Sequence, residues 1–230
     1  MPGEQPRPTG RPGDQLPTLE PGVTHLTVPG PRSTALHQVA LHNAATWTGP
    51  VYWVDARNTA STYTLHALAP DERVVSRLRI ARAFTAYQHV SLVERVINRV
   101  TPRAGGIILP NLPSLYRDDD VLDHEADAFI GSVADALAVV ADAYDIPVLV
   151  TDTTADDFAD TLATRADRQL QCERTGMGYR FEGADIETTV YWQDGAWQTT
   201  IPYWVELVGA VGDRPAIPVD AQPLQFAVEG

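Results

Sequence analysis

THLTVPGPRSTALHQVALHNAATWTGPVYWVDAR, residues 24–57, has the pattern of a strand, a tight loop, a helix and a second strand. The apolar residues at its start fit a short buried strand, and the PGP at 29–31 forces a sharp turn. Ser33 or Thr34 is expected to cap the helix that follows. A crossover of about thirty residues is typical of a βαβ unit, so the stretch predicts an α/β domain.

The loop of this unit lies where an α/β domain binds a phosphate, but it lacks the chemistry of a P-loop. The pattern G-x-x-x-x-G-K-[ST] uses backbone N–H groups to cradle phosphates, a Lys to reach the β/γ-phosphates and a hydroxyl for magnesium. The present loop is shorter and has no Lys. It leaves Gly30, Arg32, Ser33 and Thr34 as a vestigial nucleotide-binding set, whose two hydroxyls at the helix start could still receive an anion.

The chain of 230 residues is acidic, with 17 basic residues against 30 acidic ones and a net charge of −13. It contains no Lys, so every basic side chain is Arg. This composition is typical of a halophilic proteome, in which dense carboxylates keep protein surfaces hydrated and salt screens their repulsion. One cysteine, Cys172, excludes an internal disulfide. No apolar run of about 18 residues and no signal peptide is present, which predicts a soluble, cytoplasmic protein without membrane contact.

The remaining pattern alternates strands and helices and then changes to a period of two. The Pro- and Gly-rich residues 1–22 are expected to be a disordered leader, followed by one domain over 23–209 and a tail over 210–230. Further strands are expected at 78–84, 107–109, 148–150, 168–173, 188–193 and 197–201, and helices at 86–100, 121–144 and 154–164. The order predicts a mostly parallel twisted sheet flanked by helices, with antiparallel strands at its C-terminal edge.

Four regions of the chain resemble the ATPase core of RecA/RadA-type recombinases. They are VYWVD (51–55), RIARAFTAYQH with LVE (79–94), IILPNLPSLYR (107–117) and AYDIPVLVT (143–151). The similarity runs from about residue 23 to residue 201. It implies a RecA-like P-loop NTPase fold, with nucleotide bound outside the carboxyl ends of the parallel strands.

The positions that the resemblance makes catalytic are changed. The family's Gly-Lys-Thr is met by GPRST at 30–34, where Pro removes an N–H and Arg replaces Lys. Arg57 stands where the family has a Glu that activates water. Pro110, or Asn111 if the register shifts by one, stands where it has the magnesium-associated Asp. Because ATP hydrolysis needs charge stabilisation, a metal and an oriented water together, we expect a degenerate ATPase that is not an enzyme and requires no metal or cofactor.

The regions that contact DNA in the family are also changed. Residues 117–127 and 152–160 are acidic here, and neither supplies the basic groove with aromatic platforms that single-stranded DNA requires. The first Phe is Phe84, so the family's Phe-x-x-Ala subunit-linking motif is not expected in the leader. A recombinase filament is therefore not predicted, and the oligomeric state stays open.

One basic region remains, and the sequence leaves two interpretations of it. Its arginines either pair with the abundant carboxylates or form a surface for nucleic acid or an acidic partner. They are Arg73, Arg77, Arg79, Arg82, Arg95 and Arg99, followed by Arg103.

These features together predict a non-catalytic RecA/RadA-like paralogue that binds other proteins, with a recombinase among the candidate partners. Two alternatives remain at this level. One is a DNA-binding recombination accessory that binds ATP without efficient hydrolysis. The other is a RecA-like regulatory module unrelated to DNA.

The acidic composition predicts that folding depends on salt. With 30 carboxylates and no Lys, dilution of KCl should lower the melting temperature, because repulsion between like charges is then less screened. Thermal unfolding followed by circular dichroism in low and in multimolar KCl tests this, and an unchanged melting temperature would contradict it.

Overall fold

The computed structural model describes residues 16–31, 33–176, 178–184, 186–193 and 196–200. The expected boundary at residue 209 and the tail 210–230 lie outside this range, as does Arg32.

The described residues form a single mixed sheet. Its parallel strands are β1 (Gly22–Thr27), β2 (Val51–Ala56), β3 (Leu78–Ala83), β4 (Gly106–Leu109), β5 (Pro147–Asp152) and β6 (Arg168–Thr175). Its antiparallel strands are β7 (Gly178–Gly183), β8 (Ile186–Gln193) and β9 (Ala196–Thr200). The strand order is β3-β2-β4-β5-β1-β6-β7-β8-β9. The predicted α/β class, with a mostly parallel sheet and antiparallel strands at the C-terminal end, is confirmed, although β7 was not predicted.

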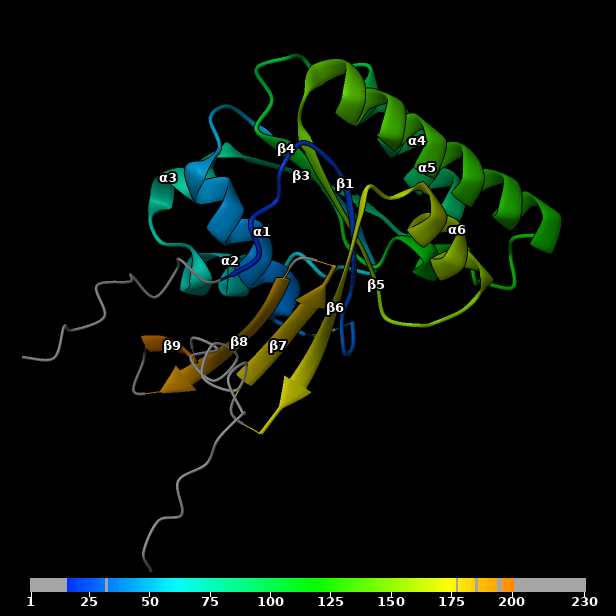
Figure 1. Ribbon diagram of the computed structural model, residues 1–230. Coiled ribbons are helices and arrows are strands. Elements are labelled where there is room, and N and C mark those ends of the chain that lie inside the picture. Colours follow the sequence, from blue (N-terminus) through cyan, green and yellow to red (C-terminus); the bar gives the residue numbers. More distant parts are fainter. Residues whose placement is uncertain (1–15, 32, 177, 185, 194–195, 201–230) are drawn as a thin grey trace, which may run out of the picture. The chain divides into compact units, whose positions relative to one another are not determined.

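Helices cover both faces of the parallel part of the sheet (Figure 1). One face carries α1 (Ala35–Thr46), α2 (Thr62–Leu68) and α3 (Glu72–Arg77), and the other carries α4 (Ala86–Ile97), α5 (Asp123–Tyr144) and α6 (Asp157–Arg165). A short 3-10 helix, η1 (Leu112–Leu115), follows β4. The chain leaves β1 toward the first face and β5 toward the second, so the loops after these neighbouring strands diverge.

The core follows from the alternation of side chains along the strands. Leu26, Trp53 and Ile108 pack with α1, while Ile107 and Val150 pack on the opposite face with α5. Each is at most 1% exposed, because helices cover both faces of the central parallel strands.

Side-chain caps begin most of the helices. Ser61, Asp71, Thr85 and Asp156 accept backbone N–H bonds at the starts of α2, α3, α4 and α6. At α1 the cap is different, because Thr34 makes no capping bond and the Ser33 hydroxyl accepts the Ala35 N–H at 3.2 Å.

The prediction of a disordered leader is wrong for residues 16–22, which the structure describes as ordered. Leu19 is 4% exposed and packs in the same core as α1. The buried side chain of Asn43 accepts the Leu19 N–H at 2.7 Å and donates to the Pro17 carbonyl at 2.8 Å. Asn43 thus supplies hydrogen-bond partners for the Leu19 N–H and the Pro17 carbonyl, which lie outside any strand. The composition of the leader does not indicate this contact.

Replacing this clamp should destabilise the domain. Asn43→Ala leaves the Leu19 N–H and the Pro17 carbonyl unpaired, at a cost of about 2 kcal/mol in the free energy of unfolding. Urea denaturation measures the change. Asn98→Ala, an exposed position at the end of α4, is the control and should alter stability by less than about 0.5 kcal/mol. Equal losses in the two variants would show that Asn43 does not anchor the leader.

Candidate functional site

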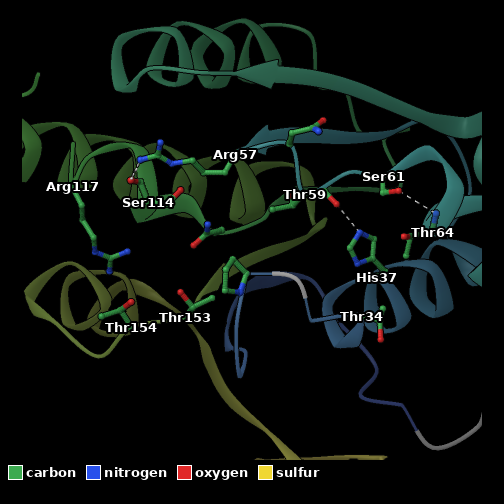
Figure 2. A pocket seen from close by; sticks show the side chains of 13 residues that line it. Thr34, His37, Arg57, Thr59, Ser61, Thr64, Ser114, Arg117, Thr153 and Thr154 are labelled. Atoms are coloured by element: carbon green, nitrogen blue, oxygen red, sulfur yellow. Dashed lines mark hydrogen bonds between the residues drawn. The ribbon is translucent and has the colours of Figure 1, made fainter. Parts of the chain in front are cut away.

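A hollow of about 730 Å³ opens at the carboxyl ends of β1, β2, β4 and β5, and we call it the strand-end pocket (Figure 2). Open α/β sheets bind ligands at this edge. The pocket is lined by Pro31, Thr34, His37, Arg57, Asn58, Thr59, Ser61, Thr64, Asn111, Ser114, Arg117, Thr153 and Thr154.

The turn after β2 is built around Asp55, which is fully buried. Its carboxylate accepts the backbone N–H groups of Thr59 at 2.9 Å and Ala60 at 3.1 Å, and it accepts the Thr59 hydroxyl. Arg82, its neighbour on β3, approaches it to 3.5 Å. All these contacts compensate one buried charge, so Asp55 is occupied in shaping the pocket wall.

Three residues that line the pocket have a left-handed backbone. Arg57 has φ 61°, Asn58 has φ 56° and Asn111 has φ 49°. Such conformations cost on the order of 1–3 kcal/mol outside glycine, and they persist only where surrounding contacts impose them. Here Asp55 imposes the first turn, and the Thr151 hydroxyl accepts the Asn111 N–H at 2.8 Å in the second. The pocket rim is therefore held in a fixed shape.

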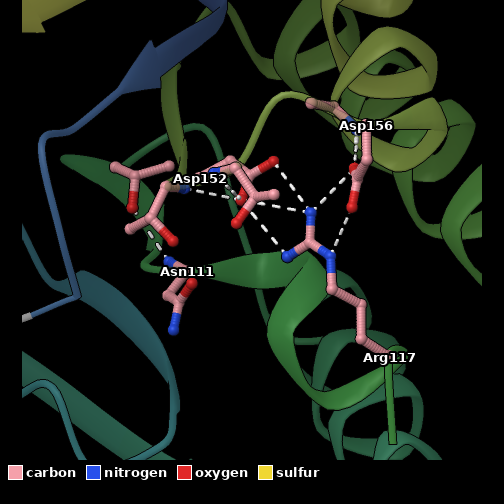
Figure 3. Close-up of polar contacts among 8 residues, drawn as sticks. Asn111, Arg117, Asp152 and Asp156 are labelled. Carbon is pink, nitrogen blue, oxygen red and sulfur yellow. Dashed lines mark hydrogen bonds and ion pairs between the residues drawn. The ribbon is translucent and has the colours of Figure 1, made fainter.

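Arg117 joins the loops after β4 and β5 (Figure 3). Its guanidinium donates to Asp156 at 2.6 and 2.8 Å and to Asp152 at 3.2 Å. Asp152 is fully buried at the end of β5 and also accepts the N–H groups of Thr153 and Thr154. The hydrogen bond from Arg117 lowers the pKa of Asp156, which in turn caps α6.

His37 projects from α1 toward the turn after β2. One ring nitrogen, Nε2, contacts the Thr59 carbonyl at 2.9 Å, and the ring lies 5.8 Å from that of Trp53. Burial lowers the pKa of His37, so the imidazole is neutral at pH 7 and donates to the carbonyl. His37 therefore helps to fix the turn.

The chemistry of the pocket is that of a polar binding site without acid groups. Its wall offers seven hydroxyls and two guanidinium groups, and no Asp or Glu lines it. Within the described part of the chain, no three His, Cys, Asp or Glu side chains lie close enough together to hold a metal ion.

The residues predicted from the sequence fall into two separate places. Thr34, Arg57 and Asn111 meet in the strand-end pocket. Gly30 and Ser33 lie in the loop between β1 and α1, where the Ser33 N–H donates to the Gly30 carbonyl at 2.9 Å. Pro110 is buried and directly follows β4. The guanidinium of Arg57 donates to the Ser114 carbonyl at 2.8 Å and to the carboxylate of Asp118, both in the segment after β4.

Sequence reasoning missed several pocket residues, including His37, Ser61, Thr64, Thr153 and Thr154. A usable signal existed, because most of them follow directly after a predicted strand or begin the next helix. Contacts between distant parts of the chain, such as that of Arg117 with Asp152, have no local sequence pattern that indicates them.

The basic region lies elsewhere, at the β3 edge of the sheet. Of its arginines, Arg82 pairs with a carboxylate, Asp55. No ion pair with a described carboxylate forms at Arg73, Arg77, Arg79, Arg95, Arg99 or Arg103. For these six, no ion pair is seen among the residues that the structure describes, and the interpretation as a partner surface stays a prediction.

The fold and the pocket define an α/β protein with a mostly parallel sheet and a polar site at its strand ends. No protein-family model matches the chain, and no curated protein compared with it gives a significant match. No helix in the described part is long and apolar enough to cross a membrane.

The clamp formed by Arg117 should be essential for stability. Arg117→Gln leaves the buried carboxylate of Asp152 without its cation, and removing one partner of such a pair costs about 3 kcal/mol. Arg165→Gln, which breaks the exposed pair with Asp135, is the control and should cost less than about 1 kcal/mol. Chemical denaturation at pH 7 measures both, and similar losses would contradict the role assigned to Arg117.

The same variant should change the response to acid. A carboxyl whose pKa is lower in the folded state stabilises the protein above its unfolded pKa of about 3.9, and this contribution disappears as the pH falls through the folded pKa. In Arg117→Gln, Asp156 loses the bond that lowers its pKa. Stability should therefore decline less steeply than in the parent chain below about pH 4.

Proposed function

We propose that the chain is a non-catalytic RecA/RadA-like paralogue that acts by binding another protein, in recombination, repair or their regulation. The resemblance of residues 23–201 to the recombinase core supports this proposal. So does the position of the strand-end pocket, at the edge of the sheet where that family binds nucleotide.

The observation that carries the proposal is the state of the two strand-end carboxylates. Asp55 is enclosed by the Thr59 and Ala60 N–H groups and Arg82, and Asp152 by the Thr153 and Thr154 N–H groups and Arg117. Hydrolysis of ATP needs groups that hold magnesium and orient water. Both carboxylates are fully buried behind the described pocket wall and their charges are already compensated, so neither suits this role.

The proposal predicts no ATP turnover. In a phosphate-release assay with Mg-ATP in multimolar KCl, with and without single-stranded DNA, the chain should release no more phosphate than the Arg32→Ala, Thr34→Val double variant. Both changes lie in the loop that would bind the phosphates, so turnover shared by the two proteins is contamination. Release at the rate of an active recombinase, lost in the double variant, would refute the proposal.

The second candidate is a nucleotide-binding accessory that does not cleave its ligand. The lining of the strand-end pocket favours it, because seven hydroxyl donors and no carboxylate line it, although the guanidinium groups of Arg57 and Arg117 are already paired with carboxylates.

Calorimetry separates the two candidates. Saturable micromolar binding of ATP that is abolished by Arg32→Ala, and retained by Arg165→Gln, would favour the nucleotide-binding accessory. Because no carboxylate lines the pocket, this binding should not require magnesium. Absence of binding with and without magnesium would leave protein binding as the function.

A further inference from the structure

A second hollow lies between the edge strand β3 and helix α4, and we call it the arginine groove. It has a volume of about 790 Å³. Apolar side chains of Tyr52, Leu92 and Val96 line it together with Arg77, Arg79, Arg95 and Arg99, and no acidic residue lines it. A chain with a net charge of −13 thus gathers four positive charges in one concave site.

The charges of these arginines are not neutralised by described carboxylates. Arg77 donates to the carbonyls of Ala44 and Trp47 at the end of α1, and Arg79 donates to the Ser76 carbonyl at 2.8 Å. The side chains of Arg95 and Arg99 make no hydrogen bond or ion pair within the described part of the chain. Both are exposed and line the same groove, Arg95 from the last turn of α4 and Arg99 from the turn that follows it.

Most arginines elsewhere in the described fold behave differently, with Arg174 on β6 as an exception. Those at positions 57, 117, 165, 168 and 180 each pair with Asp or Glu. Carboxylates are therefore readily used as partners in this protein. Gathering like charges without such partners costs free energy, so the groove is suited to a partner that brings negative charge from outside.

The backbone beside the groove is also open. β3 is the first strand of the sheet order and pairs on one side with β2. An edge strand presents N–H and C=O groups that another extended chain is able to pair with. Leu78 to Ala81 of β3 line the groove together with Gly49, Pro50 and Tyr52, so the groove lies over the face of β2 and β3, directly beside this edge.

A smaller hollow of about 520 Å³ continues the arginine groove past the end of β3. It shares Leu92 and Arg95 with the groove and adds Arg82, Phe84 and Tyr87. Phe84 is 65% exposed and Tyr87 46%. Large aromatic side chains exposed beside a charged groove are typical of protein interfaces.

We propose that the arginine groove binds an extended acidic segment of a partner protein, which adds a strand to β3 and places its carboxylates on Arg79, Arg95 and Arg99. The backbone pairing supplies affinity, and the guanidinium groups select acidic side chains on alternate positions. Apolar residues of the segment contact Tyr52 and Leu92. This inference rests on the proposed protein-binding function and gives it a surface and a partner chemistry.

The open strand edge favours a peptide over nucleic acid. A peptide satisfies both the backbone groups of β3 and the arginines, whereas a nucleic acid satisfies the arginines alone. The net charge of −13 also repels a long polyanion more strongly than a short acidic segment.

The test uses a fluorescent peptide of about eight alternating Asp and Val residues, ~26 Å long when extended. Anisotropy with the full chain, at the lowest KCl in which circular dichroism shows it folded, should give saturable binding. Arg95→Gln and Arg99→Gln should each weaken this binding about fivefold, as for an exposed ion pair. Arg174→Gln removes the same charge at an exposed position of β6 and should leave the affinity unchanged.

Two control peptides test the chemistry. Replacing every Asp by Asn should remove the salt dependence and most of the affinity. Methylating alternate backbone nitrogens should weaken binding at least as much as the arginine variants, because it blocks strand pairing.

Several outcomes would overturn the inference. Equal binding of the Asn peptide, or equal weakening by Arg174→Gln, would remove the role of the groove arginines. Oligothymidine binding that depends on Arg95 and Arg99 would assign the groove to nucleic acid. Concentration-dependent dimers abolished by Arg95→Gln would assign it to a second copy of the chain. Each result is independent of the phosphate-release assay, so failure of this inference and failure of the non-catalytic function are distinguishable.

Discussion

The contact of Arg117 with Asp152 and Asp156 is the interaction on which the carboxyl edge of the sheet depends. Arg117 follows η1. It contacts Asp152 at the end of β5, 35 residues later in the chain, and Asp156, the cap of α6, 39 residues later. The pairing of β4 with β5 ends at Leu109 and Val150, so the sheet alone does not hold together the loops that follow these two strands. A buried carboxylate without its cation would be costly there, and this cost holds the loops in one arrangement.

The same device recurs at β2, where Asp55 is held by its own turn and by Arg82. In both places an aspartate at a strand end, the position at which an enzyme of this architecture places reactive groups, is used to fix backbone conformation. The left-handed residues Arg57, Asn58 and Asn111 show how firmly the rim is fixed. A carboxylate that accepts from several N–H groups and lies against a guanidinium has its charge compensated within the fold, which weakens its attraction for a metal ion. The carboxylates of Asp55 and Asp152 therefore stabilise the loop conformations, and this role competes with binding of a metal ion or a water.

Periodicity was sufficient for most of the fold and insufficient for the site. The apolar runs at 107–109 and 148–150 and the helical pattern at 121–144 depend on neighbours in sequence, and they predicted β4, β5 and α5. The burial of Leu19 depends on Asn43, and β7 on pairing with β6 and β8, which no local pattern encodes. Likewise, Asp118 lies in the acidic segment 117–127 and meets Arg57 across 61 residues. The charge pattern of the sequence does not indicate which carboxylate the fold brings to an arginine.

The arginines of this chain separate into two populations, and the separation bears on function. In a protein with 30 carboxylates, most arginines away from β3 have an acidic partner, as Arg165 on α6 and Arg168 on β6 do, although Arg174 pairs with no described carboxylate. The arginines beside β3 instead remain without one in the described structure, next to an unpaired strand edge and exposed aromatic rings. The strand-end pocket is stabilised by satisfied charges, whereas the β3 edge keeps its charges unsatisfied. Binding free energy is gained where charges and backbone groups still lack partners. On this argument the proposed function is exerted at the edge of the sheet, and the site at the strand ends maintains the fold.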